Sequence, residues 1–174
     1  MKNRMVKYPL ILGTIALIAG LLLALIYNIT APVIEKNKNK RENAVVVEMF
    51  GDSVKIEDNS SSLNDIDKSA GITAALKVNS NGTYYVYKIT FNDSFDGDQS
   101  SFVVALDSSG KVYKLKFTAV GDSYANKYST SGYETSVVGK ESLTSNDVVN
   151  GATKTGNSVV EAINAAIAHQ GRVK

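Results

Sequence analysis

Apolar and polar residues divide the chain into one long apolar run and a mixed remainder. Residues 8–30, "YPLILGTIALIAGLLLALIYNIT", contain no charged side chain. Because about 20 apolar residues in a helix cross a bilayer, this run predicts a transmembrane helix. Pro9 suits the start of a helix, and Tyr8 and Tyr27 suit the two membrane surfaces. A cleaved signal peptide is the alternative, which the length of the run and the lack of a small-residue cleavage site disfavour.

The segment after the span is predicted to be a short helical stalk over residues 31–51. Val45, Val46 and Phe50 can share one helical face there, and Gly51 can end the helix. The following segment, residues 56–71, reads "IEDNSSSLNDIDKSAG" and is predicted to be a loop because Ser, Asn and Asp dominate it.

Strand patterns begin further along the chain. Residues 83–91, 101–107 and 111–120 are predicted strands, and the last alternates apolar residues with Lys and Tyr. The turn "DSSG", residues 107–110, is predicted to join the last two as a hairpin, with Gly110 free to take a positive φ. Residues 122–146 are turn-rich. A terminal helix over residues 158–169 carries its apolar face at Val159, Val160, Ile163 and Ile167.

These elements together predict an α+β protein. A single N-terminal transmembrane helix is followed by a small domain with an antiparallel sheet and a C-terminal helix. The predicted organisation is a tail over residues 1–7, a transmembrane helix over 8–30, a stalk over 31–51 and a folded domain over 52–174.

Charge is distributed unevenly along the 174 residues. Residues 1–43 carry seven Lys and Arg against two Asp and Glu, a balance of +5, and the remainder carries twelve against fifteen, a balance of −3. Three basic residues precede the span and four follow it, so their count does not set the orientation. A short tail ahead of a first span usually stays in the cytoplasm, which predicts an extracytoplasmic domain.

Composition excludes several kinds of site. The chain has no Cys, which rules out disulfides, iron–sulfur ligation and Cys-based zinc sites. Its one histidine, His169, leaves no His cluster for a metal, and its place near the end of a terminal helix predicts a solvated side chain. Without Trp or a basic stripe with interleaved aromatics, nucleic-acid binding has no support. Any redox chemistry must therefore come from a cofactor.

The stretch "NGATKTGN", residues 150–157, is the strongest candidate for a binding site. Ser158 and Glu161 fit an S-x-x-E capping box, which predicts a helix start at Ser158 and a loop before it. Unpaired N–H groups at such a start attract phosphate, and Gly151 and Ala152 leave room for a ligand. If the loop is extended, Thr153 and Thr155 point the same way. These features alone leave a plain structural turn and a phosphate site both open.

Residues 147–155, "DVVNGATKT", resemble the flavinylation motif D-x-x-[ST]-G-A-[ST]-x-T of covalent FMN-binding domains. That family includes the G subunit of the Rnf electron-transport complex and the C subunit of the sodium-translocating NADH:quinone reductase. The resemblance implies that Thr155 is joined through its hydroxyl to the phosphate of FMN by a flavin transferase outside the cytoplasm. Asp147, Gly151, Ala152 and Thr153 would be the surrounding motif positions.

The resemblance extends beyond the motif. The single span followed by "TAPVIEKNKNKRENA" is similar to the Rnf G subunit, and so is the order of hairpin, "GYETSVVGKE", motif and terminal helix. Two departures stand out. Asn150 replaces the preferred Ser or Thr, and "VGDSYANKY", residues 120–128, stands where the family usually carries a His-x-Glu-Thr-Pro-Gly-Leu-Gly-like segment. Flavin contacts from that segment are therefore not carried over.

The implied function is that of a membrane-anchored, covalently flavinylated electron carrier, with the other subunits of an Rnf-type complex and a flavin transferase as partners. The complex would couple electron transfer between ferredoxin and NAD to Na⁺ or H⁺ transport. Tyr124, Tyr128 and Tyr133 are candidate stacking partners for the flavin ring. The alternatives are a stand-alone flavinylated carrier for extracellular electron transfer and a non-enzymatic membrane-anchored binding or structural domain.

Overall fold

The computed structural model describes residues 2–51, 54–92, 98–121 and 123–174, and within these segments it describes all side chains except those of residues 2–7, 9 and 33–43. The side chains of the predicted tail, residues 1–7, and of most of the predicted stalk thus lie outside the described residues. The chain forms two compact units, residues 1–41 and residues 42–174.

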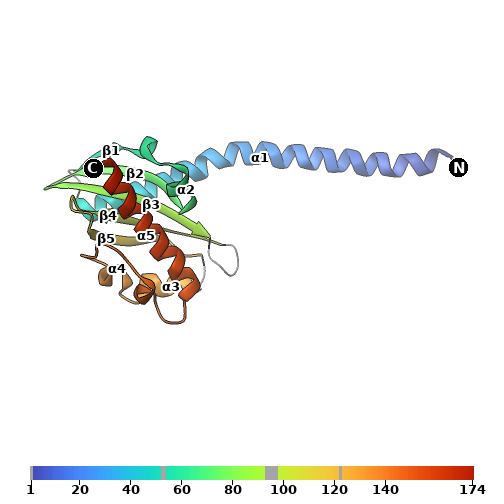
Figure 1. Ribbon diagram of the computed structural model, residues 1–174. Coiled ribbons are helices and arrows are strands. Elements are labelled where there is room, and N and C mark those ends of the chain that lie inside the picture. The colour runs from blue at the N-terminus through green and yellow to red at the C-terminus, as the bar shows by residue number, and fades with distance from the viewer. Residues whose placement is uncertain (1, 52–53, 93–97, 122) are drawn as a thin grey trace. The chain divides into compact units, whose positions relative to one another are not determined.

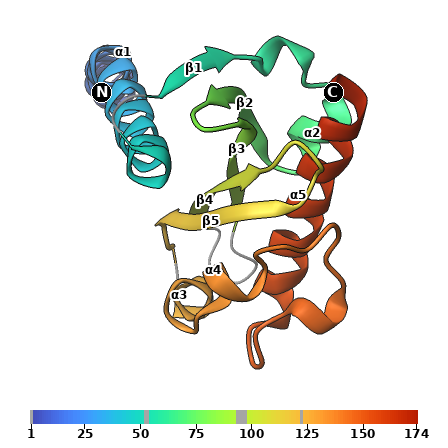
Figure 2. The ribbon, with the colours of Figure 1, turned by 90° about the vertical axis from the view of Figure 1, so that its left-hand side faces the viewer.

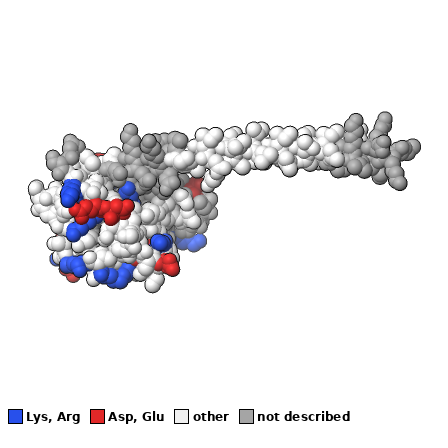
Figure 3. All heavy atoms as spheres, turned by 90° about the horizontal axis from the view of Figure 1, so that it is seen from above, with Lys and Arg blue, Asp and Glu red and all other residues white. Residues whose placement is uncertain are grey.

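The first unit is helical throughout its described length. It is the larger part of α1 (Lys2–Phe50), and its segment Leu10–Pro32 has a mean hydropathy of 2.6, long and apolar enough to cross a membrane. The side chains of this segment form a surface without Lys, Arg, Asp or Glu (Figure 3). The hydroxyls of Thr14 and Thr30 donate to carbonyls four residues earlier, each at 2.8 Å, so these polar groups are satisfied inside the helix.

The second unit is built on a five-stranded antiparallel sheet in the order β1-β2-β3-β4-β5 (Figure 1). The strands are β1 (Lys55–Asp58), β2 (Ile72–Asn79), β3 (Thr83–Asn92), β4 (Gln99–Leu106) and β5 (Val112–Ala119). The three predicted strands and the α+β class are confirmed. The sequence did not predict β1, which is short and mostly polar, or β2, in which two adjacent Ala residues weaken the strand pattern.

Helices of very different lengths follow or interrupt the sheet. They are η1 (Ser60–Ser62), α2 (Asp65–Ser69), α3 (Ser123–Thr130), α4 (Tyr133–Ser136), η2 (Ser145–Asp147) and α5 (Thr153–Val173). The prediction of a plain loop over residues 56–71 is therefore wrong in part. Asn64 and Asp67 form a reciprocal cap at α2, and Asp67 also pairs with Arg172 of α5. This partner is 105 residues away, so no local pattern could indicate it.

Residues alternate between two cores on the two faces of the sheet. On β4, Val104 and Leu106 belong to the core shared with α5, and Val103 and Ala105 belong to the core on the opposite face. That second core includes Val46 and Met49 at the end of α1. Residues 44–50 thus form part of the folded unit. Figures 1 and 2 show α5 lying across the other face of the sheet.

The hairpin turn between β4 and β5 is confirmed. The Asp107 carboxylate accepts from the backbone N–H groups of Ser109, Gly110 and Lys111 at 2.8–3.0 Å. Gly110 takes φ +100°, a backbone conformation that favours glycine.

The prediction that His169 is solvated is wrong, because its side chain is completely buried. Its Nδ1 lies 2.9 Å from the Tyr87 hydroxyl of β3, and its Nε2 lies 3.0 Å from the Ser62 hydroxyl. Ser62 in turn donates to the Asn59 carbonyl at 2.6 Å. These directions suit an imidazole with its proton on Nε2. The network ties the last turns of α5 to the sheet and to η1.

Candidate functional site

The terminal helix α5 begins earlier in the structure than the sequence predicts. α5 begins at Thr153, with Ala152 as its N-cap and with no side-chain cap bond among the described residues. The capping box predicted at Ser158 and Glu161 is therefore wrong, since both residues lie inside the helix. The buried stripe of α5 explains the earlier start, because it continues upstream of Val159 through Gly156 and Thr155. Gly156 and Thr155 are not apolar residue types, so the apolar pattern of the sequence does not extend to them.

The two threonines of the motif point in different directions. Thr153 is exposed, while Thr155 is only 1% exposed. They would point the same way only in an extended loop, and that condition is not met, because both lie in α5 and residues two apart in a helix are about 200° apart around its axis. The Thr155 hydroxyl is buried and has no hydrogen-bond partner among the described residues. A buried polar group without a partner is uncommon and calls for a reason.

Tyr128 of α3 closes the first turn of α5. Its hydroxyl accepts from the backbone N–H of Val149 at 2.9 Å and donates to the carbonyl of Ala152 at 3.2 Å. A Cβ added at Gly156 would lie 1.9 Å from this hydroxyl and 2.7 Å from the Val148 side chain. Position 156 therefore requires glycine, because the Tyr128 hydroxyl and the Val148 side chain lie too close for any larger residue. Burial raises the pKa of the Tyr128 phenol, so the group stays neutral and keeps its proton to donate.

Asp147 holds the segment that leads into the motif. Its carboxylate pairs with the Lys140 ammonium and accepts from the backbone N–H of Thr144 at 2.7 Å. These two interactions hold the pKa of Asp147 below its usual range. Gly151 takes φ +77°, and the Lys127 ammonium donates to its carbonyl at 3.2 Å. A cation therefore lies close to the N-terminus of α5.

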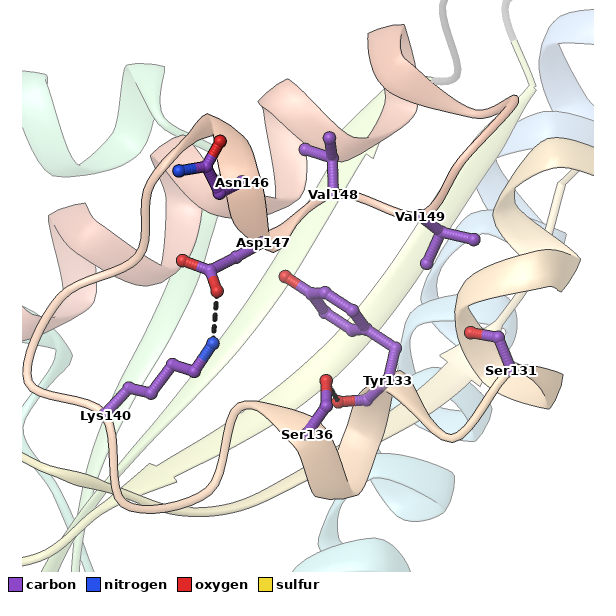
Figure 4. A pocket seen from close by; sticks show the side chains of 8 residues that line it. All are labelled: Ser131, Tyr133, Ser136, Lys140, Asn146, Asp147, Val148 and Val149. Carbon is purple, nitrogen blue, oxygen red and sulfur yellow. Dashed lines mark hydrogen bonds and ion pairs between the residues drawn. The ribbon is translucent and has the colours of Figure 1, made fainter.

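A cavity of about 350 Å³ opens beside Asp147 (Figure 4). Its lining is Ser131, Tyr133, Ser136, Lys140, Asn146, Asp147, Val148 and Val149. The Tyr133 hydroxyl points toward the segment that carries Asp147 and Val148, and it finds no hydrogen-bond partner in the part of the chain that the structure describes. Burial raises the pKa of this phenol well above its usual value. Thr155 does not line the cavity. Val148 lines the cavity and also faces Gly156.

Two of the three tyrosines proposed as stacking partners are core residues. Tyr128 and Tyr133 pack edge to face, with ring centroids 4.7 Å apart and an interplanar angle of 79°. Tyr124 is half-buried, and the Lys127 ammonium lies 5.3 Å from its ring centroid. Sequence reasoning did not single out Lys140 or Gly156. A glycine inside a helical segment is a signal of close packing, and it could have drawn attention to Gly156.

The comparison with protein families gives a match at the other end of the chain. Residues 1–48 match the family described as the RnfG N-terminal region. This N-terminal part of the chain is RnfG-like. The match includes the apolar segment Leu10–Pro32, and this segment supports single-pass membrane anchoring of the chain. No curated protein matches the sequence.

Proposed function

We propose that this chain is a membrane-anchored electron carrier, the G subunit of an Rnf-type complex, that holds FMN covalently through a phosphoester at Thr155. The observation that carries the proposal is the occurrence of D-x-x-N-G-A-T-x-T in a chain whose residues 1–48 match the RnfG N-terminal region. The two signals lie at opposite ends of the chain and are independent of each other.

Two features around Thr155 favour a phosphoester. Its buried hydroxyl lacks a partner among the described residues, and an ester oxygen would no longer need to donate. The N-terminus of α5 and the nearby Lys127 ammonium offer a positive environment for a phosphate. A phosphate does not fit beside a side chain that is 1% exposed, so attachment requires the segment before α5 to move.

The cavity beside Asp147 offers a place for the flavin ring. Tyr133, Val148 and Val149 give it apolar walls, and Lys140 and two serines give it polar edges. FMN held there would supply electron-transfer chemistry that none of the side chains of this protein can perform. The residues of the chain would bind the cofactor, orient it and exclude part of the surrounding water.

The membrane span fits this role. A span of the length of Leu10–Pro32 would confine the flavin to a thin layer near the other subunits and so raise its effective concentration for them. The domain would lie outside the cytoplasm, where a flavin transferase can reach it, and the whole complex would couple electron transfer between ferredoxin and NAD to Na⁺ or H⁺ transport.

The test is to express the full chain with a flavin transferase and to inspect a denaturing gel under ultraviolet light. We expect a fluorescent band that Thr155→Ala abolishes and that Thr130→Ala, a matched variant outside the motif, retains. A dark wild-type band beside a fluorescent control flavoprotein would rule out the covalent flavin and favour a binding or structural domain. Co-purification with further membrane subunits would indicate a subunit of a complex, and purification without them would indicate a stand-alone carrier.

A further inference from the structure

The burial of Thr155 creates a problem of access that the proposed function must solve. In a transfer from flavin adenine dinucleotide, a bond forms between Thr155 Oγ1 and the flavin-side phosphorus, and the bond from that phosphorus to the AMP oxygen breaks. The hydroxyl proton passes to a base of the transferase, AMP leaves, and no electron is transferred. Each of these events requires that Oγ1 be reached from outside, whereas Thr155 is 1% exposed.

The cover over the first turn of α5 has a defined attachment point. The Tyr128 hydroxyl bridges Val149 and Ala152 by two hydrogen bonds, which span 21 and 24 residues of sequence. The same oxygen and the Val148 side chain lie directly over Gly156, the residue after Thr155. Tyr128 itself is anchored, since its ring is fully buried and packs against Tyr133 and Phe117.

Apart from the Tyr128 bonds, the covering segment is held by the Lys127 ammonium, which donates to the Gly151 carbonyl at 3.2 Å, and by the Ala152 N–H, which donates to the Val149 carbonyl at 3.1 Å within the segment itself. Residues 148–151 are half-buried or exposed and have no regular helix or strand structure. Short segments of this kind open locally more easily than the strands and helices that flank them. Loss of the Tyr128 bonds would therefore make residues 148–152 open more often while α3 and the sheet stay folded.

We propose that Tyr128 acts as a latch that controls when Thr155 can be modified. The inference rests on the proposed function, with Thr155 as the flavin acceptor. Tyr128 is a positioning residue: it acts through Val149 and Ala152, and it holds the acceptor hydroxyl inside until the segment opens. Flavin transfer then proceeds from the open minority of molecules, and its rate follows the open fraction.

The test compares Tyr128→Phe with Tyr87→Phe in the full chain, purified in detergent. Both substitutions remove one buried phenol hydroxyl and keep the ring. The Tyr87 hydroxyl, however, bonds His169 in the network at the other end of α5. Flavinylation is followed with purified transferase and flavin adenine dinucleotide, at transferase levels where the rate is proportional to its concentration. Hydrogen exchange of the peptide covering residues 147–157 is measured on the same unmodified samples.

Removal of the Tyr128 hydroxyl leaves the Val149 N–H unpaired, so we expect Tyr128→Phe to raise both the flavinylation rate and the exchange rate by about tenfold. We expect Tyr87→Phe to stay within about twofold of the wild type at this segment.

Two results would overturn the latch. If Tyr128→Phe is labelled at the same rate as the wild type, the latch is wrong and the flavin function stands. If no form is labelled while a control flavoprotein is, or if Thr155→Ala keeps its label, the proposed function and the latch fail together.

Discussion

Gly156 and Thr155 are adjacent residues that continue the buried stripe of α5. Gly156 lies under the Tyr128 hydroxyl of α3 and the Val148 side chain, which are near it only in the folded chain. A small residue and a hydroxyl thus occupy positions that a helix normally gives to apolar side chains. Such a departure from the usual pattern is typical of functional sites.

Gly156→Ala is expected to destabilise the protein by about 1 to 3 kcal/mol, because the added methyl collides with the Tyr128 hydroxyl and Val148. Gly171→Ala in the same helix faces open space, and it should be neutral or stabilising by up to about 1 kcal/mol. Urea unfolding followed by circular dichroism in detergent measures both. Equal effects of the two substitutions would show that the close approach at 156 is not real.

His169→Ala is expected to cost about 2 to 4 kcal/mol, since it removes a buried side chain and leaves the Tyr87 hydroxyl without its partner. The double variant with Tyr87→Phe should cost less than the sum of the two single variants, because the hydroxyl that His169 satisfies is then gone. Additive free energies of unfolding would mean that the two side chains are not coupled.

At the scale of elements, short caps and turns fix the path of the chain into the motif. η2 has a reciprocal cap between Thr144 and Asp147, and Asp147 adds the ion pair with Lys140. The path of the chain into residues 148–152 therefore depends in part on an ionised carboxylate. The pKa of that carboxyl is depressed, so its contribution to stability is fully present above the unfolded pKa and is lost as the pH falls through the folded pKa.

Asp147→Asn is expected to lower stability by about 1 to 2 kcal/mol at pH 7 and to have less effect as the pH falls below about 3.9. Unfolding of the wild type and the variant at pH 7, 5 and 3 measures the difference. If the difference in the free energy of unfolding between the wild type and the variant stays constant from pH 7 to pH 3, the charge of Asp147 is not the cause of the stabilisation. Glu141→Gln is the control, because the Glu141 side chain is largely exposed in its pair with Lys111.

At the scale of the whole molecule, the boundary of the folded unit lies inside a continuous helix. The compact unit begins at Glu42, and Val46 and Met49 of α1 complete the core on one face of the sheet. The sequence pattern assigned these residues to a stalk that ends at residue 51. Their burial shows that the end of α1 also has a part in folding.

A chain that begins at Glu42 is expected to fold as a soluble domain, whereas one that begins at residue 52 should be less stable by several kcal/mol or aggregate. The shorter chain loses the burial of Val46 and Met49, worth about 1.5 to 3 kcal/mol each, and exposes Val78, Val86 and Val103. Thermal unfolding and size-exclusion chromatography compare the two. Equal melting temperatures would contradict the assigned role of residues 42–50.

Local sequence patterns were enough to predict the parts of this protein that depend on neighbours in the chain. An uninterrupted apolar run predicts the span, strand-like runs predict β3 to β5, and Asp107 with Gly110 predicts the hairpin turn, because each requirement is met within a few residues. The motif itself can also be recognised in the sequence. That Thr155 carries the flavin stays a prediction.

Tertiary contacts, by contrast, decide which side chains of α5 are buried. Thr155 is buried and Thr153 is exposed because both lie in α5, whose buried stripe includes Thr155 and Gly156, and Tyr128 and Val148 pack on Gly156. His169 is buried because β3 and η1 bring Tyr87 and Ser62 to it. These partners are 82 and 107 residues from His169 in the sequence, so a pattern of near neighbours carries no information about them.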